Sequence, residues 1–350
     1  MSVSSDIASR FIQLVNRSHR LNGRPFDEGT KLLPPGGPFR SWVHYGVMIP
    51  DLPAPHHYFN VMSIVGTPGA TVFDNDFALA GEPRDTAYLI SSTASMTPGQ
   101  FRSYSISRDC EFREDGSFQK FGSNLEIEGE FPNWKVRRFS DGVEVILNIE
   151  ATSTVSHFAH IPKLYDHWSL LCRYTGTVQH SGVSDEVQGL CTFEYACGVG
   201  RYSIGSGRTP ARGKLPLNFF TYQIINVNER KQLLLVQVLG PGNFPLQQTV
   251  YVRSLDDLGR TYNRAVKLTV ETYQPETETT PDGFEMKVPR RFAWYAETDD
   301  GKPVLSLSCE VAGPFEFGLG AGYASWFNYK GTLEGESIQG KGYLEYIDRR

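Results

Sequence analysis

The hydrophobic and polar pattern predicts strands over most of the chain. After the Pro/Gly-rich segment at 32–39, short apolar runs rich in β-branched and aromatic residues recur between Gly, Pro, Asn and Asp turns. Within 191–197 (CTFEYAC), the Cys and aromatic residues alternate with Thr, Glu and Ala, which is the two-residue period of a strand with one buried face. The runs are WVHYGVMI, YFNVMSIVG, NLEIEGEF, VEVILNIEA, QLLLVQVLG, AVKLTVET and VLSLSCEVA. We therefore expect a mainly β protein.

The first 22 residues have a different pattern, that of one amphipathic helix. Ile7, Phe11, Leu14 and Val15 follow a helical spacing, and Gly23 ends the helix. We expect a docked helix rather than one on a membrane surface, because few basic residues accompany the apolar stripe. Two roles stay open for it: capping a barrel, or forming a homodimer.

Two stretches of the chain resemble each other. VQGLCTFEY at 187–195 aligns without gaps with IQGKGYLEY at 338–346, and each follows a shorter match, YTGTV at 174–178 and YKGTL at 329–333. The spacing predicts a final hairpin whose loop is four residues shorter in the second copy. The opening strands also correspond, Tyr45 with Tyr222. A repeat this long indicates a duplicated domain rather than a solenoid.

The duplication divides the chain into three parts. These are an N-terminal helix and linker (1–35), a first β-domain (36–205) and a second β-domain (206–350), with a Gly- and Ser-rich connection at 200–216. Closed antiparallel barrels are favoured because they leave no open sheet edge to aggregate.

The end of the chain carries the motif G-x-G-Y-x-E, formed by Gly340, Gly342, Tyr343 and Glu345, after a hairpin with Tyr329, Gly331 and Gly335. With the duplication, it resembles the superfamily of hydroxyneurosporene synthase (carotenoid 1,2-hydratase) and AttH-like proteins, which includes Diels–Alderase-type cyclases. This resemblance implies two tandem lipocalin-like β-barrel domains over 36–350 and an enzyme acting on an apolar small molecule. The chain departs from the family by ending in Ile347 and Asp348 where a further Gly-Tyr is common, and no catalytic residue is carried over.

Composition excludes several classes of protein. Hydrophobic residues make up 40% and charged residues 21%, so a sizeable core is available, and a net charge of −5 gives no support to a nucleic-acid partner. Five cysteines without a CxxC pair disfavour both a disulfide framework and a zinc ribbon. The sequence shows neither a signal-peptide core nor an apolar stretch long enough for a transmembrane segment, so we expect a cytoplasmic protein.

The duplication also separates candidate chemistry from candidate scaffold. A residue present in both copies most simply serves the fold, so Glu194 and Glu345 are interpreted as structural or solvent-facing. Histidines occur only in the first half, and several lie in SHFAHIPKLYDHW at 156–168. A loop is favoured there over a metal site, because the spacing matches no recognised ligand motif. We predict no metal and no cofactor, with His157 as a candidate acid or base.

Two further groups are candidates for proton transfer. Asp74 and Asp76 would share one face of a strand and could hold one raised pKa, although a turn is the favoured interpretation. His44 shares a strand face with Trp42 and Met48, and it is the best single candidate if that face lines a cavity. The candidate ligand contacts are Trp42, Tyr45, Tyr165 and Trp168.

The hypothesis is an enzyme that needs no cofactor and acts on a terpenoid, polyketide or lipid-like molecule. It would use acid–base catalysis in an apolar pocket to hydrate, isomerise or cyclise its substrate. The alternative is a non-catalytic carrier of a hydrophobic ligand, since a fold does not fix a function.

Overall fold

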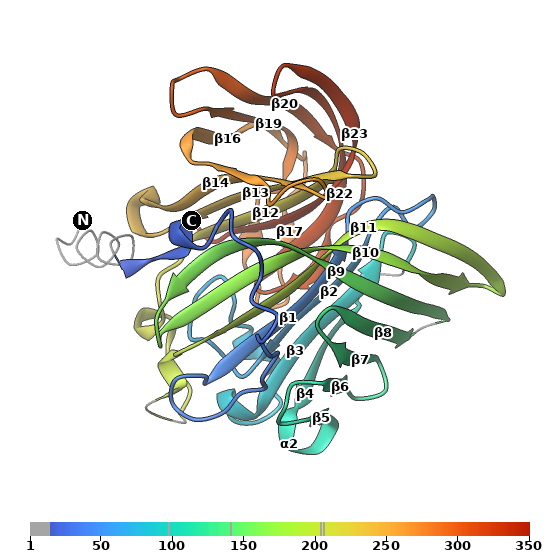
Figure 1. The fold of residues 1–350 in the computed structure, drawn as a ribbon. Helices are drawn as coiled ribbons and strands as arrows, with labels where there is room; N and C mark the ends of the chain where they lie inside the picture. The colour runs from blue at the N-terminus through green and yellow to red at the C-terminus, as the bar shows by residue number, and fades with distance from the viewer. Residues whose placement is uncertain (1–14, 97–98, 141, 204, 206) are drawn as a thin grey trace.

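The computed structural model describes residues 15–350 except 97–98, 141, 204 and 206. Two large antiparallel sheets, one from each half of the chain, account for most of it. In Figure 1 the second sheet (yellow to red) curls above the first (blue to green), and each forms a nearly closed barrel. The expected mainly β architecture with two tandem lipocalin-like barrels is confirmed. Residues 1–14 of the expected N-terminal helix lie outside the described residues, and from residue 16 on the chain forms the 3-10 turn η1 (Ser18–Arg20) rather than a continuation of that helix.

The first barrel contains β1 to β11, in the order β4-β3-β2-β1-β11-β10-β9-β8-β7-β6-β5. Its strands are β1 (Trp42–Ile49), β2 (Phe59–Val65), β3 (Thr86–Thr93), β4 (Phe101–Ser105), β5 (Cys110–Phe112), β6 (Phe118–Phe121), β7 (Leu125–Glu130), β8 (Asn133–Ser140), β9 (Val143–Ile161), β10 (Tyr165–His180) and β11 (Val183–Gly198). The short helix α2 (Ile106–Asp109) joins the two edge strands β4 and β5.

The second barrel runs in the order β15-β14-β13-β12-β23-β22-β20-β19-β16, with β21 paired to β22. Its strands are β12 (Phe219–Asn226), β13 (Lys231–Leu239), β14 (Pro245–Ser254), β15 (Arg260–Tyr262), β16 (Arg264–Tyr273), β19 (Pro289–Glu297), β20 (Pro303–Val311), β21 (Glu316–Leu319), β22 (Gly322–Leu333) and β23 (Glu336–Asp348). A separate ribbon pairs β17 (Glu278–Thr279) with β18 (Glu285–Met286), and the remaining helices are the 3-10 turns η1 (Ser18–Arg20), η2 (Asp76–Ala78), η3 (Pro83–Asp85), η4 (Arg201–Ser203), η5 (Ala211–Gly213) and η6 (Pro241–Asn243).

The final hairpins of the two halves match in detail. Tyr174 lies opposite Gly189, and Tyr329 lies opposite Gly340, so the predicted alignment is confirmed. Strand pairing reaches the same kind of two-residue turn in both copies, at 181–182 and 334–335. The expectation of a shorter second loop is therefore wrong, because the four-residue difference lies in the paired arms.

The correspondence of the opening strands is shifted by one residue. Glu194 pairs with Gly46, whereas its repeat equivalent Glu345 pairs with Tyr222. Tyr222 therefore corresponds to Gly46 and not, as expected, to Tyr45. The shift matters because successive residues of a strand point to opposite sheet faces.

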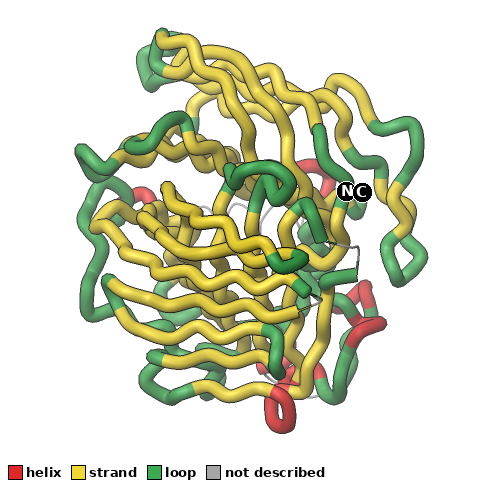
Figure 2. The backbone as a smooth tube through the Cα atoms, turned by 90° about the vertical axis from the view of Figure 1, so that its right-hand side faces the viewer, coloured by secondary structure: helices red, strands yellow, loops and turns green. Residues whose placement is uncertain are grey.

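Alternation along the strands separates the barrel interiors from the surface between the barrels. Cys191, Phe193 and Tyr195 lie in the core of the first barrel, as predicted. A third apolar cluster lies between the barrels, and both barrels contribute residues to it. Figure 2 shows the backbones of the two barrels one above the other. Its members are Met48, Tyr58, Phe158, Tyr222, Ile224, Leu234, Val236, Tyr251, Ala324 and Tyr343. The outer faces of β1, β10 and β11 are thus covered by the second barrel.

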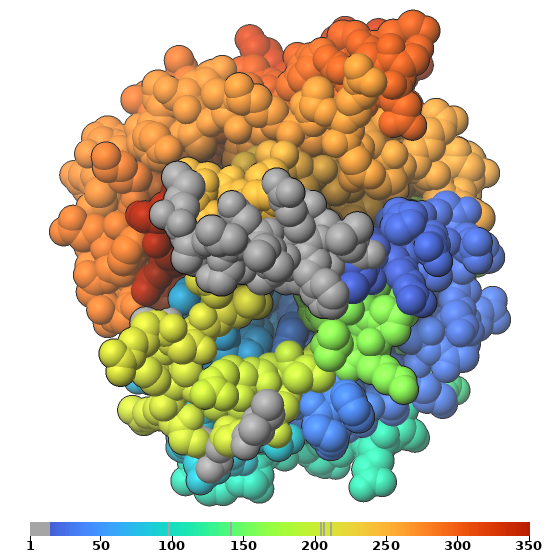
Figure 3. Space-filling view, turned by 90° about the vertical axis from the view of Figure 1, so that its left-hand side faces the viewer, coloured from blue at the N-terminus to red at the C-terminus, as the bar shows by residue number. Residues whose placement is uncertain are grey.

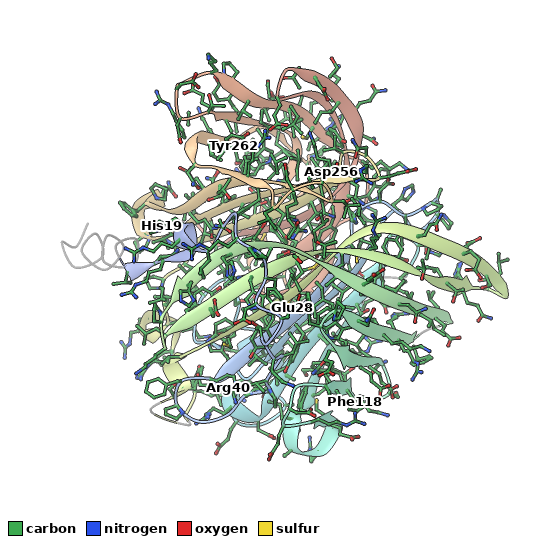
Figure 4. All side chains as sticks on the ribbon, viewed as in Figure 1. His19, Glu28, Arg40, Phe118, Asp256 and Tyr262 are labelled. Atoms are coloured by element: carbon green, nitrogen blue, oxygen red, sulfur yellow. The ribbon has the colours of Figure 1, made fainter. Side chains whose placement is uncertain are left out.

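Figure 4 shows side chains of both barrels, with Arg40 and Phe118 labelled on the first barrel and Asp256 and Tyr262 on the second. The five cysteines are free thiols. Among the helices of the described residues, none combines the length and the apolar character needed to cross a bilayer.

Candidate active site at the barrel interface

Three neighbouring strands of the first barrel bring together two imidazoles and a carboxylate. His44 of β1 and His167 of β10 both pair with Ala196 of β11, one on each side, and Glu194 lies two residues away on the same strand. Residues that pair across strands share a sheet face, so all three side chains point outward from the barrel toward the second one. The small Ala196 side chain leaves the space between the imidazoles open.

The reactive atoms of the three side chains converge. The Nε2 atom of His44 lies 3.8 Å from Oε2 of Glu194, and Nε2 of His167 lies 3.9 Å from the same oxygen. The imidazole rings meet edge to face, with their centroids 5.7 Å apart. These separations exceed hydrogen-bond length, so each atom keeps its capacity to bind a proton or a ligand between them.

The remaining polar atom of each group is held by a neighbour. The Nδ1–H group of His44 donates to the carbonyl oxygen of Ser63 at 2.8 Å, which places the lone pair of the neutral ring on Nε2. The Nδ1 atom of His167 lies 2.9 Å from the Tyr165 hydroxyl. We conclude that the imidazoles are oriented rather than loosely packed.

A glycine makes room for this arrangement. A Cβ atom on Gly46 would lie 2.8 Å from Nε2 of His44 and 3.2 Å from Cβ of Glu194. Both distances are shorter than ordinary van der Waals contact. Position 46 therefore has to be unsubstituted for His44 to lie over the strand.

The second barrel supplies a hydroxyl group to the site. Tyr222 of β12 donates a 2.5 Å hydrogen bond to Oε1 of Glu194, which is a short, charge-assisted contact. Only Oε2 of Glu194 is then left facing the imidazoles. The ring of Phe158 packs against both Tyr222 and His167, and it forms an apolar wall beside them.

A buried cation also crosses the interface. Arg253 of β14 donates from Nη1 to the backbone oxygen of Ser169 at 2.9 Å and to its hydroxyl at 3.0 Å, and Nη2 donates to the side chain of Gln232. Arg253 is 1% exposed, so its charge is little screened by water. Its positive charge interacts with the negative charge of Glu194.

The two repeat-related glutamates have opposite pKa shifts. Burial alone would raise the pKa of Glu194, but the His167 and His44 imidazoles together hold it well below its usual range. The pKa of Glu345 is raised well above its usual value by burial and then by the charge of Glu194. Oε1 of Glu345 has no hydrogen-bond partner within the described part of the chain. One carboxyl group is thus ionised and the other neutral, which is the pattern of an acid and base pair.

Solvent reaches the site from one side. The His167 side chain is 18% exposed and that of Glu194 only 2%. The rings of Trp42 and Tyr165 pack together at 5.7 Å beside His167. In Figure 3 this side of the molecule is hollowed next to the yellow-green segment that follows β11, with blue atoms of the first strands at the bottom.

The donor set can also hold a metal ion. One ligand atom each from His44, His167 and Glu194 lie within 4.8 Å of one another. Two imidazoles and one carboxylate suit a transition-metal ion better than Mg²⁺ or Ca²⁺, which prefer oxygen ligands.

A family model covers most of the chain, from residue 62 to residue 350, and it describes a family of unknown function, DUF6670. The chain belongs to the DUF6670 family. Comparison with curated proteins gave no sequence match to this DUF6670 protein.

Solved structures share its fold. An AttH-like protein from Nitrosomonas europaea matches with a TM-score of 0.56 and 11% identity, over 88% of this chain and 92% of its own. Kievitone hydratase from Nectria haematococca matches with a TM-score of 0.56 and 12% identity, over 93% and 97%. CghA, solved with Sch210972, has a TM-score of 0.49 and 10% identity, over 93% and 97%. The expected resemblance is confirmed for the fold.

The structure of the DUF6670 protein places three of the residues proposed from sequence in one site. His44 lies at its centre, and Trp42 and Tyr165 lie at its solvent-facing edge. Tyr45 and Trp168 lie elsewhere: both point into the core of the first barrel. Each of them directly follows an outward-facing histidine, His44 or His167, so strand alternation turns its side chain inward.

Asp74 and Asp76 form a separate group. Both carboxylates contact the ammonium group of Lys214, at 2.9 and 2.7 Å, and Asp74 also accepts a hydrogen bond from the backbone of Gly69. Asp74 lies in a turn and Asp76 begins η2, so the turn interpretation is confirmed. Burial raises the pKa of Asp74 to about 6, although Lys214 opposes the shift. The cluster ties the connection between the barrels to the first one.

His157 lies on β9, apart from the three converging groups. Its backbone exchanges hydrogen bonds with the side chain of Asn22, and burial lowers the pKa of its imidazole to about 4. Its charge interactions are with Asp166 and His160 and not with Glu194. These contacts attach the segment before β1 to the first barrel.

Sequence reasoning missed Glu194, His167 and Tyr222. Glu194 was set aside because it is repeated, yet it lies two residues from the position that pairs with His44. Strand alternation, applied to β1 and β11 together, was the signal that could have joined His44 to Glu194. Tyr222 could not be found that way, because it comes from the other barrel.

Proposed function

We propose that this protein is an enzyme that acts on an apolar small molecule by acid–base catalysis between its barrels. The observation that carries the proposal is the convergence of Glu194 Oε2 and two imidazole Nε2 atoms at the edge of an aromatic cluster. The lone pair on Nε2 of His44 and the carboxylate oxygen Oε2 of Glu194 are both proton acceptors. A substrate C–H or O–H group, or a water molecule, would give up its proton to one of these two acceptors.

The roles follow from which atoms are free. Glu194 takes a proton through Oε2, while Tyr222 holds Oε1 and orients the carboxylate. The neutral Glu345 is the candidate acid, because its pKa is raised and one of its oxygens is unpaired within the described residues. Removing one proton and returning another accounts for isomerisation, hydration or cyclisation without a net change in redox state.

Affinity for an apolar molecule comes from the aromatic surroundings. The rings of Phe158 and Tyr165 contact the imidazole of His167, and Trp42 packs on Tyr165. Burying about 400 Å² of apolar ligand surface would contribute roughly 10 kcal/mol before the cost of ordering the ligand. Aromatic faces also stabilise positive charge that develops during protonation of an alkene.

The test is conversion, because a carrier would bind without it. The wild-type protein and the Glu194→Gln variant are each incubated with an organic extract of the cells that make the protein, and substrates and products are compared by mass spectrometry. We expect the wild type to deplete one compound and form an isomer or a product heavier by one water. Glu194→Gln should bind that compound, seen by native mass spectrometry, and leave it unchanged.

The half-buried His160 provides the matched control. His160→Ala removes an imidazole from the neighbouring strand, 3.4 Å from Asp166 and away from Glu194. This variant should convert the compound at the wild-type rate. Unchanged ligand bound by the wild type itself would overturn the proposal and support the carrier.

A further inference from the structure

We propose that His44, His167 and Glu194 form a binding site for one divalent transition-metal ion of the Zn²⁺ type, and that the bound ion inhibits the enzyme. The inhibition rests on the proposed function, whereas the binding site rests on geometry alone. No other part of the chain that the structure describes brings three such donors together.

The three donor atoms surround one point. With two separations of 3.8 and 3.9 Å and the third within 4.8 Å, a point equidistant from all three lies about 2.5 Å from each. Zn²⁺ binds imidazole nitrogen and carboxylate oxygen at about 2.0–2.2 Å. A shift of a few tenths of an ångström in each side chain brings the donors into range, and no backbone movement is needed.

The partners of the three donors are those that metal ligands have. A metal-bound imidazole commonly donates its other N–H group to a carbonyl oxygen or a similar acceptor, and a ligating carboxylate accepts a hydrogen bond. Here Nδ1–H of His44 donates to Ser63, Nδ1 of His167 lies beside the Tyr165 hydroxyl, and Tyr222 donates to Glu194. The atoms left without such a partner are Nε2 of His44, Nε2 of His167 and Oε2 of Glu194, and these three atoms converge on one another.

A second observation also favours a ligand at this position. Nε2 of His167 is a buried polar atom that has no hydrogen-bond partner among the described residues. A buried polar atom without a partner is costly, and a metal ion would satisfy it.

Inhibition follows from the identity of the donor atoms. Tyr222 already occupies Oε1 of Glu194, so Oε2 is the oxygen that can accept a substrate proton. The ion would bind this oxygen and the lone pairs of both Nε2 atoms. Oε2 of Glu194 could then no longer accept a proton from the substrate.

Binding is tested with Co²⁺ on chelator-treated protein. We expect one Co²⁺ per chain, with visible d–d absorption bands that Zn²⁺ abolishes by displacement. His167→Gln and Glu194→Gln should lose the bands, and Tyr222→Phe should weaken binding about 10–100-fold. His160→Ala should bind as the wild type does.

The wild-type protein alone decides the matter if a variant fails to fold. A rise in its unfolding temperature that saturates at one Zn²⁺ per chain supports the site. Wild-type protein without Co²⁺ bands overturns it, and so does a folded His167→Gln variant that keeps them.

Activity on the compound identified above separates the two proposals. Chelator-treated enzyme should work at full rate, and Zn²⁺ should inhibit it over the same concentrations that displace Co²⁺. The proposal of inhibition is wrong if chelation abolishes activity and added Zn²⁺ restores it. It is also wrong if the enzyme keeps full activity with Zn²⁺ bound. If Co²⁺ binds but Glu194→Gln still turns over the compound, the proposed acid–base function fails while the metal site stands.

Discussion

Replacing Tyr222 by Phe tests the connection between the barrels at a short, buried polar contact. The change deletes the 2.5 Å hydrogen bond to Glu194 and leaves the ring in place. Hydrogen bonds to charged groups contribute about 1.5–3 kcal/mol, and both partners here are only 2% exposed. We therefore expect the free energy of unfolding to fall by about 2–3 kcal/mol, the upper part of that range.

Tyr251 provides the matched comparison. It belongs to the same apolar cluster, but its hydroxyl donates to the neutral carbonyl oxygen of His157 at 3.1 Å. Tyr251→Phe should cost about 1 kcal/mol. Both variants are measured by urea unfolding, with chelator present, from pH 5.5 to 8. Because the pKa of Glu194 is held well below its usual range, the difference between the variants should not change with pH. If Tyr222→Phe lowers the free energy of unfolding by no more than Tyr251→Phe does, the contact between Tyr222 and Glu194 is not charge-assisted.

Three other changes have definite expected outcomes. Gly46→Ala should cost about 1–3 kcal/mol and displace His44, because its Cβ would lie 2.8 Å from Nε2; urea unfolding and loss of Co²⁺ affinity check this. Lys214→Met should cost about 3–5 kcal/mol at pH 7.5, since it leaves the carboxylate of Asp74 buried without its cation. The pKa of Asp74 is about 6 with Lys214 in place and should rise further without it, so this cost should shrink as the pH falls toward 6, where the carboxyl group of the variant is protonated before that of the wild type; a cost that stays constant from pH 8.5 to 6 would contradict this. Arg253→Met should destabilise by about 3–5 kcal/mol, since it unpairs Ser169 and Gln232, and a cost below 1 kcal/mol in thermal and urea unfolding would be contrary to that expectation.

The sequence was sufficient to predict the fold because the fold depends on local pattern. Alternation in 191–197 places Cys191 and Phe193 in a barrel core, and the repeated hairpin motif corresponds to the same pairing in both halves. The one-residue shift between the opening strands escaped prediction. Strand register is set by the partner strand, and single-chain similarity around Tyr45 and Tyr222 carries no information about it.

The site was only partly predictable, because it lies between the barrels. His44 was found from the strand that carries it, but its partners come from β10, β11 and β12. Repetition of Glu194 was interpreted as a sign of a structural role. In a tandem repeat whose copies pack outer face to outer face, however, a repeated residue can appear on both sides of the interface.

The glutamates Glu194 and Glu345 have a consequence for how two copies of one barrel can differ. A homodimer of a single barrel, joined through the same faces, would present two identical carboxyl groups, and their ionisation would be shared by symmetry. Joining the copies in one chain removes that constraint. Glu194 lies beside two histidines that hold its pKa low, whereas burial and the charge of Glu194 hold the pKa of Glu345 high. Asymmetry between otherwise equivalent halves thus gives one residue type two opposite protonation states at a single interface.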